Sequence, residues 1–340
     1  MTDLPPAGLS WAAYIARWVD DCGGWLPLAD QLIARARGRF EVPDDPQTIE
    51  RGLRRLARRD HKPGGQYGRW MLRLFGVTSS IESWLRWLGV AHSRFTELPS
   101  GLRLEQLALW NRPPIAETPL VCWIELGIAH AHHSRLDHEA HDHWLSRAEL
   151  HAAAAGPAAE IELALARAES ESDARRHDTV PAHLAVVDEH LSRAFADVHA
   201  LPEADALAYR ARLAIQRALL CTRPPAGREP DLAGASRHYA SIPDSESTIP
   251  FVACSRAIGL AYCAWTLGDL ADAERWATRA IDEAGDGGLV RMRVRALNML
   301  SRVVDRERAA DINARAHRIA TMLEDEELLR RVAQSAPGTR

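Results

Sequence analysis

The sequence predicts an all-α protein, with a compact helical domain at its start and an array of α-helical hairpins after it. Apolar residues recur at helical spacing along almost the whole chain. Valine and isoleucine nowhere alternate with polar residues over a useful length, and no Asn-Gly hairpin signal occurs, so no strands are expected. The 340 residues, of which 46% are hydrophobic, suffice for a sizeable core.

Glycine and proline mark the ends of the expected helices. Examples are Gly23–Gly24, Pro43, Gly156–Pro157, Pro224–Pro225 and Gly268. Between such breaks the apolar spacing predicts helices over residues 8–21, 25–37, 46–59, 65–76, 79–92, 102–110, 119–134, 137–151, 157–173, 181–198, 203–221, 230–240, 250–267, 270–284, 288–304, 306–323 and 325–334.

The two parts of the chain differ in composition. Seven of the eleven tryptophans lie in the first 110 residues, and tryptophan buries a large area per residue, which suits a small domain. The later helices are built on alanine and leucine, which let helices pack closely. We therefore expect a tryptophan-rich, locally basic domain over 1–117, a hairpin array with a C-terminal capping helix over 118–334, and a disordered tail over 335–340.

One later segment carries a repeat pattern. In "IGLAYCAWTLGDLADAERWATRAIDEAG" (258–285), Ala261 comes early in the first helix and Gly268 makes the turn. Ala273 and Ala280, seven residues apart, fall where a second helix must approach its neighbour closely. The segment resembles a tetratricopeptide repeat. It departs from that family in its alanines at 257 and 264 and in its glycine at 285.

Weaker copies of this pattern occur at 122–152 and 290–323, and two further helix pairs lie at 157–198 and 203–240. The chain after residue 118 thus resembles an array of about five tetratricopeptide-like hairpins. An irregular all-helical domain with one fortuitous match is the alternative.

The resemblance implies a binding surface. Each hairpin leaves an apolar face that the next one covers, and the stack curves around a groove that takes a peptide or a protein. Such grooves seldom assemble catalytic groups, so no catalytic residue and no cofactor are expected. The expected groove residues are Tyr262, Trp265 and Asn298.

A second feature is the segment "DDPQTIERGLRRLARR" (44–59). Asp44 or Asp45 is placed to cap a helix that begins at Pro46. At 100° per residue, three apolar side chains share one arc and five arginines the opposite arc. Residues 31–75 hold eleven Lys/Arg against five Asp/Glu, a local excess of six positive charges in a chain whose net charge is −4.

Together with the preceding helix, in "PLADQLIARARGRFEVPDDPQTIERGLRRLARR", this segment loosely resembles the second and third helices of a helix-turn-helix. The resemblance implies contact with DNA bases or phosphates. The connection "GRFEVPDD" is longer than a tight turn, and no β wing follows. An acidic protein partner and a merely solvated arginine face remain open. The candidate residues for nucleic-acid or acidic-partner binding are Gln47, Thr48, Arg51, Arg54, Arg55, Arg58, Arg59 and Lys62.

A third feature is the histidine-rich stretch "HAHHSRLDHEAHDHWLSRAELH" (130–151). Metal ligands on one helix face need a spacing of three or four residues, which two histidine pairs satisfy. No H-E-x-x-H pattern is present, and solvated histidines are the alternative. The weak metal candidates are His130, His133, His138 and His141.

Other features bear on the setting of the protein. The five cysteines are far apart and form no C-x-x-C pair, which favours a reducing cytoplasm. The start "MTDLPPAGLSW" lacks the features of a signal peptide, and no apolar run reaches membrane-spanning length. The sequence therefore predicts a cytoplasmic, non-enzymatic peptide- or protein-binding regulator that does not act at a membrane. The alternatives are a pure protein adaptor and, more distantly, a metal-dependent enzyme at the histidine-rich hairpin.

Overall fold

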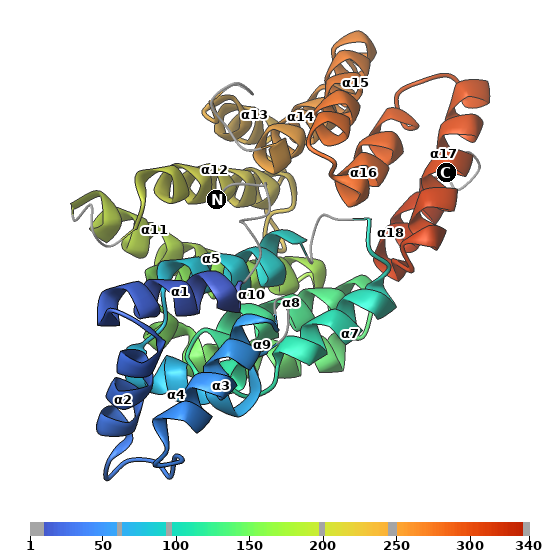
Figure 1. Ribbon diagram of the computed structural model, residues 1–340. Coiled ribbons are helices and arrows are strands. Elements are labelled where there is room, and N and C mark those ends of the chain that lie inside the picture. The colour runs from blue at the N-terminus through green and yellow to red at the C-terminus, as the bar shows by residue number, and fades with distance from the viewer. Residues whose placement is uncertain (1–9, 60–62, 93–96, 197–200, 244–249, 336–340) are drawn as a thin grey trace.

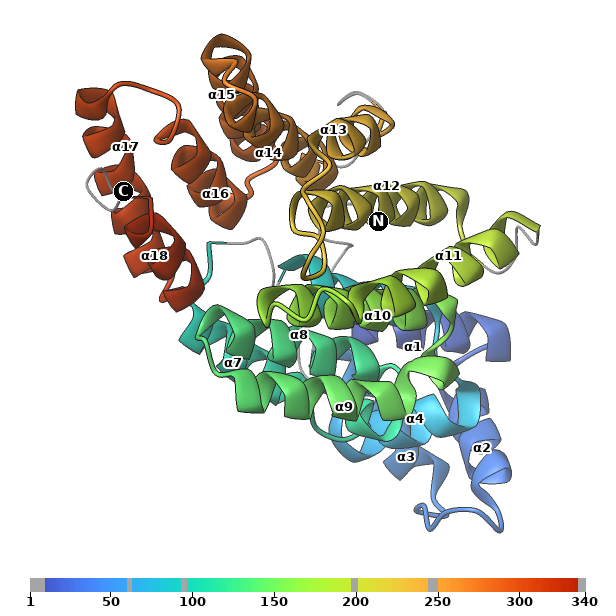
Figure 2. The same cartoon turned by 180° about the vertical axis from the view of Figure 1, so that it is seen from behind.

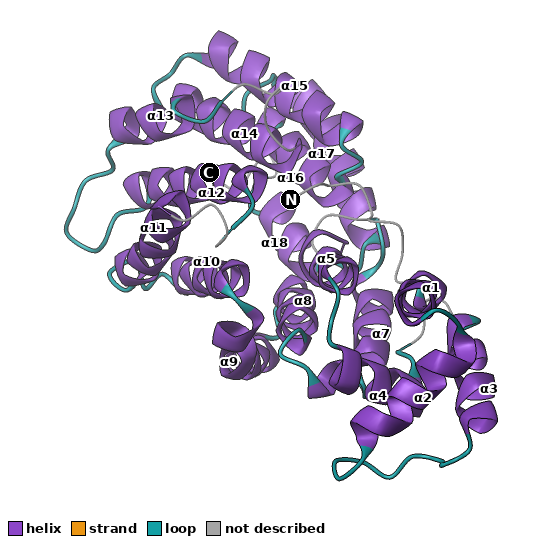
Figure 3. Ribbon diagram, turned by 60° about the vertical axis from the view of Figure 1, so that its left-hand side comes forward, coloured by secondary structure: helices purple, strands orange, loops and turns teal. Residues whose placement is uncertain are grey.

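The computed structural model describes residues 10–59, 63–92, 97–196, 201–243 and 250–335. In these ranges it contains seventeen α-helices and no strand (Figures 1 and 3). The all-α prediction is therefore confirmed. None of these helices combines the length and the hydrophobicity that crossing a bilayer requires.

The first helices form a small bundle, which we call the N-terminal bundle: α1 (Trp11–Cys22), α2 (Trp25–Ala36), α3 (Pro46–Ala57) and α4 (Gly65–Phe75). After it come α5 (Ser79–Arg86), the π-helix η1 (Trp87–His92), α7 (Ser100–Trp110) and the short 3-10 helix η2 (Ile115–Glu117). Trp11 is fully buried in this part of the core. Tyr67 of α4 packs against Gly52 of α3, where any Cβ would clash with its ring.

The rest of the chain forms five successive helix pairs and a last helix. The pairs are α8 (Val121–Ser134) with α9 (His138–Ala155), α10 (Pro157–Asp173) with α11 (Val180–Ala196), α12 (Glu203–Thr222) with α13 (Leu232–Ala240), α14 (Pro250–Thr266) with α15 (Leu270–Asp286), and α16 (Val290–Leu300) with α17 (Arg306–Met322). The last helix is α18 (Glu326–Ala333). This arrangement is consistent with a helical repeat.

Most helix ends fall within a few residues of the sequence prediction. The largest extension is α9, which runs through four alanines to Ala155 because alanine favours helix and Gly156, with φ of 105°, provides the stop. The expected helix 79–92 instead changes to π geometry at Trp87. There the Gly89 backbone approaches the Trp123 carbonyl of α8 so closely that no Cβ would fit.

Small residues allow the helix pairs to pack as expected. Ala273, Ala280 and Ala316 are fully buried. The Cys254 thiol donates to the Ala280 carbonyl at 3.3 Å, which brings α14 and α15 into close contact. The packed core continues from Trp11 to Leu213 without a break at residue 117. The expected domain division at 117 stays a prediction.

Two long-range contacts bring the ends of the array together. The amide of Ser100 donates to the Leu323 carbonyl at 2.9 Å, and the amide of Gly101 donates to Glu324 Oε2 at 3.0 Å. The start of α7 therefore meets the turn between α17 and α18. Figure 2 shows the start of α18 beside α7, and α18 also contacts α8, so the array closes into a ring.

A buried arginine holds this closure. Arg291 of α16 donates to Asp325 Oδ2 at 3.0 Å and to the Leu98 carbonyl at 2.9 Å. The Arg291 and Asp325 side chains are only 6% and 4% exposed. Asp325 also caps α18 by accepting from the Leu328 amide at 3.0 Å. One guanidinium thus joins α16, α18 and the segment before α7.

Candidate functional site

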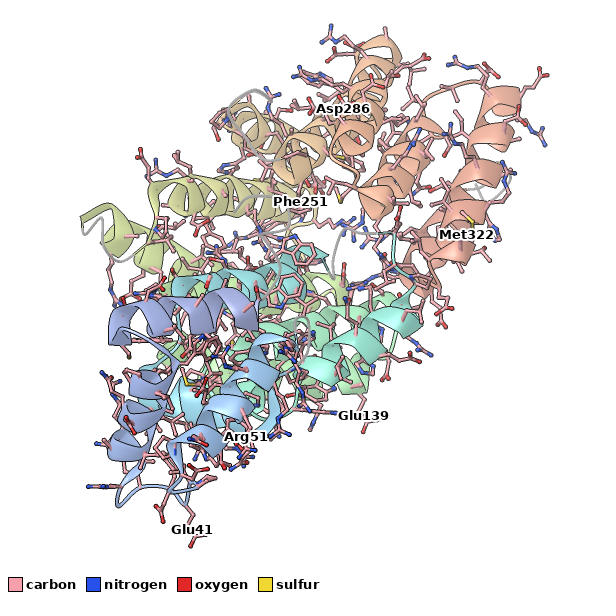
Figure 4. The ribbon with its side chains drawn as sticks, in the orientation of Figure 1. Glu41, Arg51, Glu139, Phe251, Asp286 and Met322 are labelled. Atoms are coloured by element: carbon pink, nitrogen blue, oxygen red, sulfur yellow. The ribbon has the colours of Figure 1, made fainter. Side chains whose placement is uncertain are left out.

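Helix α3 presents its arginines to solvent, as its amphipathic pattern requires. Asp45 caps the helix, accepting from the amides of Gln47 and Thr48 at 3.1 and 3.0 Å. Ile49, Leu53 and Leu56 are buried against the N-terminal bundle. Figure 4 places Arg51 near the end of the molecule that α2 and α3 form.

The arginines of this segment differ in whether they already contact a carboxylate or an aromatic ring of the protein. Arg54 pairs with Glu50 at 2.7 Å and lies over the Trp25 ring, 4.4 Å from its centroid. Arg51 turns back along its own helix, where its guanidinium donates to Thr48 Oγ1 at 3.1 Å and lies 4.0 Å from the Asp45 carboxylate. By contrast Arg55, Arg58 and Arg59 are exposed and have no carboxylate within 4 Å among the described residues. Lys62 lies outside the described residues.

A cavity of about 610 Å³ occupies the middle of the ring, and we call it the central cavity. Its wall comes mainly from the first helix of each pair and from α18. No described residue of α9, α11, α15 or α17 lines it, and α13 contributes only Tyr239. Figure 4 shows Phe251, a residue of the wall, near the middle of the molecule, far from Arg51. The ring therefore has an inner and an outer layer of helices.

The central cavity is strongly basic. Its wall holds nine arginines against four carboxylates, an excess of five positive charges when the histidines are neutral. The whole chain carries −4, so positive charge is concentrated inside the ring. The arginines are Arg103, Arg175, Arg212, Arg223, Arg291, Arg295, Arg302, Arg330 and Arg331, and the carboxylates are Glu169, Asp173, Asp325 and Glu327.

The carboxylates of the wall are already engaged. Asp325 accepts from Arg291, and Glu169 accepts from the Gln216 side-chain amide at 3.2 Å. Glu327 accepts from both Arg330 and Arg331. Arg212 pairs with Glu162 of α10. Of the remaining arginines, Arg175, Arg223 and Arg295 form no ion pair with a described residue.

Asp173 holds the junction between α8, α10 and α18. Its Oδ2 lies 3.2 Å from His133 Nε2 and its Oδ1 lies 3.6 Å from Arg331 Nη2. Burial by itself would raise the pKa of Asp173, but the His133 hydrogen bond and the charges of Arg331 and Arg295 outweigh it and hold this pKa well below its usual range. Asp173 is therefore a carboxylate at neutral pH and adds a second closure to the ring.

The groove residues predicted from the sequence lie together at the wall. Tyr262 and Asn298 line the central cavity. Trp265 lies behind them, with its ring 5.9 Å from the Tyr262 ring and the Arg302 guanidinium 5.9 Å from its centroid. Whether these residues bind a partner stays a prediction.

Sequence reasoning missed the arginines of α16. Arg291, Arg295 and Asn298 follow one another at spacings of four and three residues, so they share one face of α16. Arg302 lies in the turn just after this helix, and all four residues line the cavity. The spacing was visible in "RMRVRALNMLSR". Arginines are also frequent on the exposed helix faces of this chain. The spacing alone therefore could not show that this face lines a cavity.

The histidines of the histidine-rich hairpin lie in different surroundings: some are near one another, one lines the central cavity and one is buried between helices. The His133 ring lies 5.2 Å from the His141 ring and 6.5 Å from the His138 ring, and His130 lines the central cavity. Among the described residues, no three His, Cys, Asp or Glu side chains are arranged to hold a metal ion. His141 is 3% exposed, with Nδ1 2.9 Å from the Ala129 carbonyl. At least this histidine serves in packing α9 against α8.

Comparisons with protein-family models, with curated proteins and with solved structures found no match.

Buried His141 predicts a pH-dependent stability. Burial lowers the pKa of His141 below its ordinary value of 6.5, despite the hydrogen bond to the Ala129 carbonyl that opposes the shift. The unfolded chain therefore binds a proton more readily than the folded one, and stability falls as the pH drops through about 6.5. Urea unfolding at pH 7.5 and 5.5 should show a smaller decrease in stability for His141→Gln than for the wild type. Equal decreases would show that His141 does not contribute.

Proposed function

We propose that this chain is a non-enzymatic, tetratricopeptide-like receptor that binds an acidic peptide segment inside its ring and contacts DNA through α3. The observation that carries the proposal is the central cavity, whose arginine-rich wall is assembled from the inner helices of successive pairs. Its volume of about 610 Å³ lies within the range of about 300–1,000 Å³ that is usual for sites of small ligands.

The closed ring limits the size and chemistry of the ligands that the central cavity can bind. An open groove could accept a folded domain, whereas the cavity that α8, α10, α12, α14, α16 and α18 bound has a volume of about 610 Å³, which fits a short peptide segment better. Apolar side chains such as Ile258, Met292 and Met299 lie among the arginines. The wall thus matches a ligand that carries both negative charge and apolar groups. Away from bulk water, each charge contact is also stronger.

Binding is favoured over turnover by the contacts of the reactive groups. His133 pairs with Asp173, but no described serine, threonine or cysteine side chain lies within hydrogen-bond distance of His133. Burial raises the pKa of Cys122 and of Cys254 to about 12, which keeps both as thiols at neutral pH. This arrangement supports a receptor without a nucleophilic step.

The contact with DNA is proposed from α3. Arg55 of α3 and Arg58 and Arg59 just after it have no carboxylate partner among the described residues. Helix α3 lies at one end of the molecule, remote from the central cavity (Figures 1 and 4). This geometry supports contact with phosphates along a duplex while the cavity remains accessible. A chain that binds peptide but no DNA would instead be a protein adaptor.

Peptide binding is expected to depend on negative charge. A fluorescein-labelled Glu-Leu-Glu-Leu-Glu-Leu peptide should bind more tightly than the matched Gln-Leu peptide, and rising salt should weaken it through screening. Fluorescence anisotropy measures both affinities. Tyr262→Ala should weaken the binding, whereas Leu270→Ala on the exposed outer helix α15 should not. Equal affinity for the two peptides, or binding of neither, would contradict the proposal.

DNA binding is expected to depend on the free arginines of α3. Duplex DNA of arbitrary sequence should bind with a steep salt dependence, and Arg55→Gln, Arg58→Gln and Arg59→Gln together should lower the logarithmic salt slope by about 0.9 for each phosphate that the variant no longer binds. Anisotropy at several salt concentrations gives this slope. Arg315→Gln with Arg318→Gln, both exposed on α17, is the matched control. An unchanged slope in the α3 variant would remove α3 from the proposed interface.

A further inference from the structure

We propose that Arg295 and Asn298 on the inner face of α16 form a recognition site for a carboxylate that lies next to an amide N–H, as at an acidic or C-terminal residue of a peptide. This inference rests on the proposed function, because it assigns the chemistry by which the central cavity would recognise its peptide. It concerns a few side chains and is therefore testable apart from peptide binding as a whole.

Arg295 supplies a positive charge that the folded chain does not neutralise. It lines the central cavity, forms no ion pair with a described residue, and its Nε is buried without a hydrogen-bond partner. The two nearby carboxylates, Asp173 and Glu327, feel its charge but are bonded to His133 and to other arginines. A guanidinium in this setting favours an anion from outside, which it can bind through two parallel N–H donors.

Asn298 supplies an acceptor that the folded chain leaves unused. Its side chain is only 8% exposed and lines the cavity, and its Oδ1 has no hydrogen-bond partner among the residues that the structure describes. A buried acceptor without a donor destabilises the protein, so an unpaired amide oxygen at this place indicates a missing donor. Lying three residues after Arg295, one helical turn away, it is positioned for an N–H that neighbours the bound anion.

The surroundings agree with this ligand. Arg302, in the turn after α16, and Tyr262 of α14 also line the cavity. Arg302 already donates to Ser335 Oγ and lies near the Trp265 ring, so we assign it a supporting role. Arg291, at the other end of the face, is committed to closing the ring. The recognition site is thus centred on Arg295 and Asn298.

The test compares two small probes that differ only in the amide group. N-acetylglutamate carries two carboxylates and an N–H, whereas glutarate carries the carboxylates without it. We expect both to raise the Tm of the wild type at constant ionic strength, by about 2 °C for each tenfold increase above the dissociation constant, with N-acetylglutamate acting at lower concentration. Inorganic phosphate, run as a third probe, distinguishes a phosphorylated segment from a carboxylate.

The variants separate the two roles. Arg295→Gln should abolish the Tm shift with both probes. In Asn298→Leu, N-acetylglutamate should raise the Tm no more than glutarate does at the same concentration. Without any probe, Asn298→Leu should melt no lower than the wild type, because it removes an unsatisfied acceptor, whereas a purely structural role would lower the Tm. Arg318→Gln on the outer helix α17 is the control and should behave as the wild type.

The inference would be overturned by equal Tm shifts in the wild type and Arg295→Gln, or by a preference for N-acetylglutamate that survives Asn298→Leu. A shift with phosphate alone would also overturn it, and would point to a phosphorylated peptide. If acidic peptides bind although Arg295 and Asn298 are dispensable, the proposed function stands and this site falls. If the probes behave as expected but no acidic peptide binds, this site stands and the proposed function falls.

Discussion

The structure depends on the contact of Arg291 with Asp325 and with the backbone at Leu98. It joins residues separated by 193 and 34 positions in the sequence and lies almost entirely out of water. A buried charge without its partner destabilises a protein by about 3–5 kcal/mol, so the three segments hold one another in place. This contact closes a stack of hairpins that would otherwise end in an open groove. Closure places the arginine-rich wall of the central cavity on the inside of the ring.

A second, partly buried arginine ties the first half of the chain to the array. Arg86 of α5 donates to Asp205 Oδ2 at 2.5 Å and to the Tyr209 hydroxyl at 2.9 Å, both on α12. One turn beyond Tyr209, Arg212 pairs with buried Glu162 of α10 and lines the central cavity. The cavity wall and α5 therefore share one network of buried polar groups. This network provides a physical connection from the ring toward the N-terminal bundle, which carries α3.

Much of the fold could be predicted because the relevant signals are local. Proline and glycine ended the expected helices, Asp45 capped α3, and the alanines of 258–285 marked the close approach of α14 and α15. Closure of the ring could not be predicted. Nothing near Ser100 in the sequence indicates that its amide meets the carbonyl of Leu323, because that contact depends on the summed curvature of five helix pairs.

The candidate sites were less predictable than the helices. The sequence letter of an arginine does not reveal its surroundings. Arg55 lies on an exposed face, Arg54 lies over a tryptophan ring, and Arg291 is in a buried ion pair. Only their packing separates these roles. Asn298 lines the central cavity, but that its oxygen has no hydrogen-bond partner among the described residues became visible only with its neighbours in place.

The closure of the ring is tested most directly by hydrogen exchange at the Ser100 and Gly101 amides. These groups lie at the start of α7, where the helix itself offers them no acceptor, so only the contact with Leu323 and Glu324 protects them. We predict slow exchange of both amides in the wild type and much faster exchange in Arg291→Met, with the interior of α7 unchanged. Exchange of both amides at the rate of an unstructured peptide in the wild type would contradict ring closure.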